Sequence, residues 1–228
     1  MRKFSLLGLI ALSSVFFTTS ASATSLISPS VANIAGTVNV NTGGVFFSGL
    51  NIQQTDTGSF AGITGVTLKN LVGAPTTGAV SIPAFATFTG GPAGTVTFDL
   101  DNIFKGVGSV AGCGSNTVGN VCSPANSPFT LIQAAPGEVN IALALSGTAY
   151  LGSASTGTST APFSFSTQNT MPGTITGILA EANTDGGFTN SFSATISATS
   201  AVPEPASVLL MGAGLFAAGL VARRKARS

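Results

Sequence analysis

The 228-residue sequence predicts an all-β fold, an antiparallel β-sandwich of the jelly-roll type, over residues 24–200. Apolar and polar residues alternate along several segments, which is typical of strands with one buried face. Clusters of Gly, Pro, Asn and Asp separate these segments at regular spacing, as in all-β domains. The composition of the two ends differs from this pattern, and we expect a cleaved signal peptide before the domain and a single transmembrane helix after it.

The first 23 residues have the layout of a secretory signal peptide. Arg2 and Lys3 precede an apolar run over residues 4–17, and Ala21 and Ala23 form a small-x-small cleavage signal. This order predicts export and cleavage after Ala23. The alternative is an uncleaved N-terminal anchor, but the short apolar run and the cleavage signal favour removal.

Strand candidates follow in order along residues 24–200. The clearest lies at 139–146, where Val139, Ile141, Leu143 and Leu145 alternate with smaller or polar residues. Its Ala and Leu content would also suit a helix, but the alternation outweighs that propensity. Segments 96–101 and 192–197 alternate in the same way. Weaker candidates, which bring the total to nine or ten, lie at 31–40, 62–71, 82–88, 129–133, 163–168 and 174–179.

Cys113 and Cys122 are the only cysteines, and they lie in a segment rich in Gly, Asn and Ser. In an exported chain we expect them to form a disulfide. A metal site is the alternative, but it would need further ligands, and the sequence has no histidine.

The absence of histidine excludes the Ser-His-Asp and Cys-His nucleophile systems. The remaining acid–base candidates are Asp99 and Asp101, which lie two residues apart on one predicted strand and therefore on one face. That face lies opposite Phe98 and Leu100, so a solvated sheet surface is the simplest interpretation. A calcium site or a catalytic carboxylate pair are the alternatives. We expect no cofactor.

The distribution of charge excludes one class of partner. Between the two ends the chain has two basic and six acidic residues, a net charge of −4. A nucleic-acid surface needs clustered Lys and Arg, so no nucleic-acid partner is expected.

The last 27 residues combine three signals in a fixed order. Pro203, Glu204 and Pro205 follow Val202 and keep residues 202–205 extended. Residues 206–222 are apolar and rich in Gly and Ala, and as a helix they would span about 25 Å, the short end of a transmembrane length. The segment 223–227 then holds this end in the cytoplasm through its basic residues, Arg223, Arg224, Lys225 and Arg227.

This arrangement over residues 202–227 resembles the PEP-CTERM sorting domain. The resemblance implies a Gram-negative, exopolysaccharide-producing bacterium, recognition by an exosortase, and cleavage near Pro203, Glu204 and Pro205. It also implies only transient contact with the inner membrane and delivery to the cell surface or the medium. A plain single-span C-terminal anchor is the alternative, but such an anchor has no need of the Pro-Glu-Pro segment.

Residues 24–200 resemble no named family, and two function classes stay open. The first is a non-enzymatic surface or matrix protein with a structural or adhesive role in biofilm, with extracellular polysaccharide as an expected contact. The second is a secreted carbohydrate-active enzyme or a calcium-dependent sugar-binding module that uses Asp99 and Asp101. The absence of catalytic side chains favours the first.

Overall fold

The computed structural model describes residues 29–53, 56–73, 75–152, 158–167 and 170–199, together with Leu215. The predicted signal peptide and the sorting segment therefore lie outside the described residues, Leu215 excepted. Within the described part, no helix is both long enough and apolar enough to cross a membrane.

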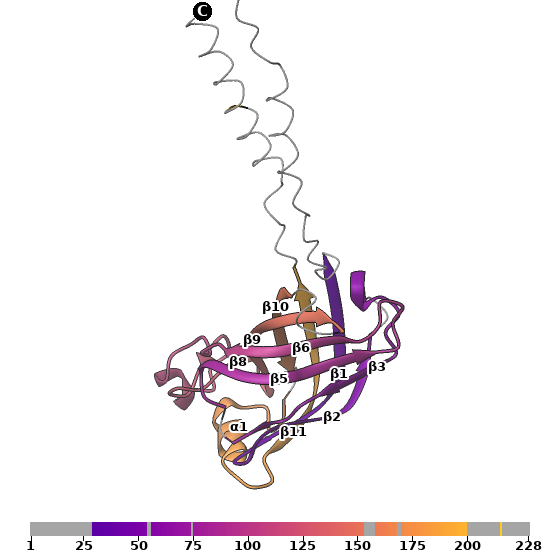
Figure 1. The fold of residues 1–228 in the computed structure, drawn as a ribbon. Helices are drawn as coiled ribbons and strands as arrows, with labels where there is room; N and C mark the ends of the chain where they lie inside the picture. Colours follow the sequence, from indigo (N-terminus) through magenta and orange to yellow (C-terminus); the bar gives the residue numbers. More distant parts are fainter. Residues whose placement is uncertain are drawn as a thin grey trace, which may run out of the picture.

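The described chain is built mainly of β-strands, with one α-helix, α1 (Ile175–Ala182), and two short 3₁₀ helices, η2 (Gly58–Phe60) and η3 (Ala111–Gly114) (Figure 1). The strands are β1 (Ser30–Asn41), β2 (Gly44–Ile52), β3 (Gly65–Leu68), β4 (Leu71–Val72), β5 (Gly78–Thr89), β6 (Val96–Ile103), β7 (Val121–Cys122), β8 (Phe129–Ala135), β9 (Glu138–Leu151), β10 (Ser159–Thr167) and β11 (Phe188–Ala198).

All of these strands belong to one antiparallel sheet. Its order is β3-β5-β6-β9-β10-β11-β1-β2-β4, with β8 also paired to β9 and β7 paired to β8. The all-β, antiparallel prediction is thus confirmed. The predicted division into two sheets is not confirmed, because the strands form one continuous hydrogen-bonded sheet that curls (Figure 1).

Phenylalanine side chains fill the inner face of the curl. The ring of Phe47 on β2 makes edge contacts with Phe85 on β5, Phe165 on β10 and Phe192 on β11, with ring centroids 5.6–6.3 Å apart. β2 and β5 lie near opposite ends of the sheet order, so the contact of Phe47 with Phe85 joins the two arms of the sheet. Each such aromatic pair stabilises the fold by about 0.5–1.5 kcal/mol beyond the area it buries.

The strand pattern follows the predicted alternation most closely in β9. Val139, Ile141, Leu143 and Leu145 are all buried, while the residues between them are half-buried or exposed. β2 was not predicted from the sequence. Its residues GVFFSGLNI lack a regular alternation, and β2 forms because its backbone pairs with β1 on one side and β4 on the other.

The strand predicted at 174–179 is wrong, because this segment begins the helix α1. The side chain of Thr174 caps the helix by accepting a hydrogen bond from the backbone N–H of Gly177 at 3.2 Å. Ile175 and Ile178, three residues apart, are buried on one side of the helix. That spacing places both side chains on a single helical face, which outweighs the β preference of Thr and Ile.

Candidate functional site

Asp99 and Asp101 lie on the outward face of β6, as predicted, and each is bonded within the sheet. Oδ1 of Asp99 accepts hydrogen bonds from the backbone N–H of Ala84 at 2.6 Å and from the hydroxyl of Tyr150 at 3.2 Å. Oδ2 of Asp101 accepts a bond from the hydroxyl of Thr148 at 3.3 Å. These bonds tie the outer face of β6 to its neighbours β5 and β9.

Asp99 stabilises the backbone of β5 by accepting a hydrogen bond from the N–H of Ala84. Ala84 has a φ of +48°, a conformation that costs a non-glycine residue free energy, and Asp99 holds its N–H. Burial raises the pKa of the Tyr150 hydroxyl, and the nearby charge of Asp99 raises it further. The phenol therefore stays protonated at neutral pH and remains a donor to Asp99.

A metal ion would need more ligands than Asp99 and Asp101 supply. Over the described ranges, no group of three or more His, Cys, Asp or Glu residues is arranged to hold one. Calcium takes six to eight oxygen ligands, and Oδ1 of Asp99 is already engaged by two protein donors.

Cys113 and Cys122 form the predicted disulfide, with their Cα atoms 4.9 Å apart. Cys122 is buried against Leu131 and Ile175 in a small second hydrophobic core, separate from the phenylalanine core. The disulfide loop also reaches helix α1, because Asn116 accepts a hydrogen bond from the backbone N–H of Thr176 at 3.1 Å. The bridge therefore fixes one side of α1.

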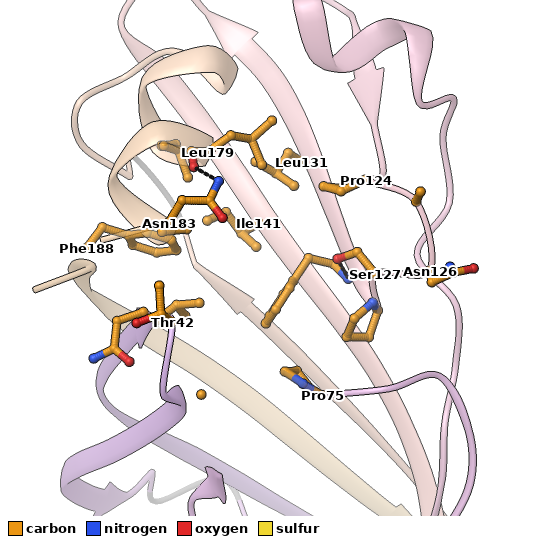
Figure 2. A pocket seen from close by; sticks show the side chains of 18 of the residues that line it. Thr42, Pro75, Pro124, Asn126, Ser127, Leu131, Ile141, Leu179, Asn183 and Phe188 are labelled. Atoms are coloured by element: carbon orange, nitrogen blue, oxygen red, sulfur yellow. Dashed lines mark hydrogen bonds between the residues drawn. The ribbon is translucent and has the colours of Figure 1, made fainter. Parts of the chain in front are cut away.

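A hollow of about 560 Å³ lies beside helix α1, and we call it the α1 hollow (Figure 2). Its walls come from the β1–β2 turn, the loops at 75–76 and 124–128, the strands β8, β9 and β11, and α1 itself. In Figure 2, Thr42 and Phe188 lie on one side of the hollow and Pro124 and Ser127 on the other.

The lining of the α1 hollow is mainly apolar. Leu131, Ile141, Ile178 and Phe188 form its floor and belong to the second hydrophobic core. None of the described residues that line it carries a charge. No local pattern in the sequence indicates this site, since its walls come from segments as distant as Val40 and Phe188, which the pairing of β1 with β11 brings together.

The outward face of four adjacent strands, β1, β11, β10 and β9, presents small uncharged side chains in register. We call this the small-residue face. Two rows of paired residues define it: Ala35, Ser193, Ser166 and Ala142, and beside them Asn33, Thr195, Ser164 and Ala144. The hydroxyl of Thr195 donates a hydrogen bond to the side chain of Asn33 at 2.9 Å, which connects β11 and β1 on this face.

The remaining predicted functional residues lie outside the described part of the chain. These are the signal cleavage residues Ala21 and Ala23 and the C-terminal residues Pro203, Glu204, Pro205, Arg223, Arg224, Lys225 and Arg227. Their roles stay predictions as far as the structure is concerned.

Comparison with known proteins bears on the C-terminal segment. A family model described as the PEP-CTERM protein-sorting motif matches residues 201–225, which include all of these C-terminal positions except Arg227. Neither a curated protein nor a solved structure matches the chain. The β domain matches no named family. The chain therefore carries a PEP-CTERM sorting motif, which indicates an exported protein that an exosortase sorts.

Proposed function

We propose that the protein is a non-enzymatic component of the cell surface or extracellular matrix, with a structural or adhesive role in biofilm or exopolysaccharide. The observation that carries this proposal is the sorting motif at residues 201–225, which directs the β domain to the outside of the cell. The domain is the only substantial part of the chain that is left to act there.

The processing that accompanies this role belongs to the same proposal. The signal peptide is removed after Ala23, and the exosortase cleaves near Pro203, Glu204 and Pro205. Residues 206–222 then serve only as a temporary membrane helix, and the basic segment 223–227 keeps the C-terminus in the cytoplasm until cleavage. The mature protein ends near Val202.

The small-residue face supports an adhesive role. Neighbouring strands lie about 4.7–4.9 Å apart, so the hydroxyl groups of Ser166 and Ser193 lie close together across β10 and β11, and those of Ser164 and Thr195 form a second such pair beside them. An uncharged surface of this kind offers hydrogen bonds to a neutral polymer without the desolvation cost of buried charges.

The contacts of Asp99 favour this proposal over a carbohydrate-active enzyme or a calcium-dependent sugar-binding module. Its Oδ1 serves as a backbone support for Ala84 and as an acceptor for Tyr150. Two donors therefore engage Oδ1, which leaves only Oδ2 of Asp99 for a catalytic or calcium-binding role.

A deletion strain tests the proposal. Loss of the gene should lower polymer retention and cell aggregation, and the wild-type chain should restore both. Ser166→Lys places a charge on the small-residue face and should restore them poorly, whereas Ser81→Lys, at an exposed position on β5, should restore them fully. Unchanged retention and aggregation in the deletion strain would contradict the structural role.

A further inference from the structure

We propose that the α1 hollow is a binding site for a small, uncharged, mainly apolar molecule that carries one hydrogen-bond donor, such as a hydroxyl or a secondary amine. This inference does not depend on the proposed role in the matrix. It rests on the lining, the charge and the size of the hollow.

The floor of the hollow supplies the apolar contacts. Leu131, Ile141, Ile178 and Phe188 lie at its base and are 1–5% exposed. The half-buried side chains of Phe129, Leu179 and Ala182 also line the hollow and present apolar surface to it. Protein interiors are close-packed and contain few voids larger than a water molecule. A volume of about 560 Å³ lies within the range of small-molecule sites, which are mostly apolar with a few polar groups.

Asn183 supplies the polar contact. Its Nδ2 donates a 2.7 Å hydrogen bond to the carbonyl of Leu179 on α1, which fixes the orientation of the carboxamide. Asn183 is exposed at the rim, and its Oδ1, which makes no hydrogen bond to another described residue, points into the hollow (Figure 2). An amide oxygen accepts hydrogen bonds, so it can bind a donor on a ligand in place of water. The hydroxyl of Thr42 at the same rim already donates to Asp185 at 2.9 Å.

Charge restricts the ligand further. No described lining residue is cationic, so an anionic head group would find no partner, and an unpaired ion in an apolar site is strongly disfavoured. The chain between its two ends has a net charge of −4, which also disfavours the binding of anions. Charged amphiphiles such as fatty acids are therefore poor ligands.

Two fluorescent probes of the same ring system test the proposal on the full chain. N-phenyl-1-naphthylamine is uncharged and has one N–H donor, and 8-anilinonaphthalene-1-sulfonate adds an anionic group to the same rings. We expect the uncharged probe to bind at least tenfold more tightly than the sulfonate. Equal affinity for the two probes would overturn the assignment of an uncharged ligand.

Two substitutions on one helix locate the probe. Ala182 lines the hollow, and Ala182→Phe should fill it and weaken binding of N-phenyl-1-naphthylamine at least tenfold. Ala180 is exposed on the same helix and does not line the hollow, so Ala180→Phe should leave the affinity unchanged. The wild type and the two variants have the same apolar ends, so any probe that binds to those ends contributes equally to all three measurements. Equal affinity in the wild type and both variants, with thermal melting unchanged, would place the probe elsewhere and refute the proposal.

Discussion

The side-chain amide of Gln133 on β8 donates a 2.9 Å hydrogen bond to the carbonyl of Gly173, just before helix α1. The same side chain accepts a bond from the backbone N–H of Ile175 at 3.3 Å, and its Nε2 also lies 2.9 Å from the carbonyl of Ala135. Gln133 is 1% exposed. One buried amide therefore joins the β8–β9 turn to the start of the helix that walls the α1 hollow.

Replacing this amide should loosen both segments. Gln133→Leu leaves the N–H of Ile175 and the carbonyl of Gly173 without their partner, and each buried group left in this way costs about 1–3 kcal/mol. We expect a loss of more than about 2 kcal/mol in the free energy of unfolding, measured by urea denaturation. Gln53→Leu, at an exposed position just after β2, should change it little. Equal effects of the two substitutions would contradict the role of Gln133.

Asp99 should matter for stability and not for calcium binding. Asp99→Ala leaves the N–H of Ala84 without its acceptor and should lower the free energy of unfolding by about 1–3 kcal/mol. Asp101→Ala removes only an exposed 3.3 Å bond and should stay within about 0.5 kcal/mol of the wild type. Millimolar calcium should not shift thermal melting. A calcium-dependent rise in melting temperature that Asp99→Asn and Asp101→Asn abolish would restore the alternative of a calcium site.

The disulfide should stabilise the fold through the short ring that it closes. Cys113 and Cys122 are nine residues apart, and the chain-entropy model gives a contribution of about 2–3 kcal/mol for a ring of this size. The double substitution Cys113→Ala and Cys122→Ala should lose this amount in urea denaturation. A reducing agent should bring the wild type to the same stability and leave the variant unchanged. An effect of the reducing agent on the variant would point to another cause.

Asp56 should make stability depend on pH. Burial raises the pKa of its carboxyl, although the N–H of Asn33, which donates to Oδ1 at 2.8 Å, partly offsets this. Its Oδ2 is buried and has no hydrogen-bond partner among the residues that the structure describes. Because the folded-state pKa is raised, the contribution of this group is fully present below the ordinary Asp pKa of about 3.9 and is lost as the pH rises through the folded-state value.

The substitution Asp56→Asn isolates this contribution. The variant should be more stable than the wild type at pH 7, where the wild-type carboxylate is charged. Its advantage should shrink as the pH falls through the raised folded-state pKa towards about 4, and should stay constant below that. Thermal melting of both proteins over this pH range measures the difference. A constant difference at every pH would show that the ionisation of Asp56 is not coupled to folding.

The sequence predicted those features that depend on local pattern. Alternation located β9, since one face of this strand packs on the core, and an isolated cysteine pair predicted the disulfide. The strand β2 and the helix α1 were missed because pairing partners and the Thr174 cap decide their conformation. The curl of the sheet and the α1 hollow depend on contacts between distant segments, such as the ring contact of Phe47 with Phe85, which no local spacing encodes.

The most direct test of the central claim is the mass of the exported chain in cells with and without an exosortase. Sorting by the motif at residues 201–225 predicts that the wild type loses its C-terminal tail near Pro203, Glu204 and Pro205 only when the exosortase is present. Glu204→Ala should retain the tail, whereas Glu181→Ala, an exposed glutamate on α1, should be processed like the wild type. An intact tail in exosortase-containing cells, or equal cleavage without the enzyme, would contradict the account.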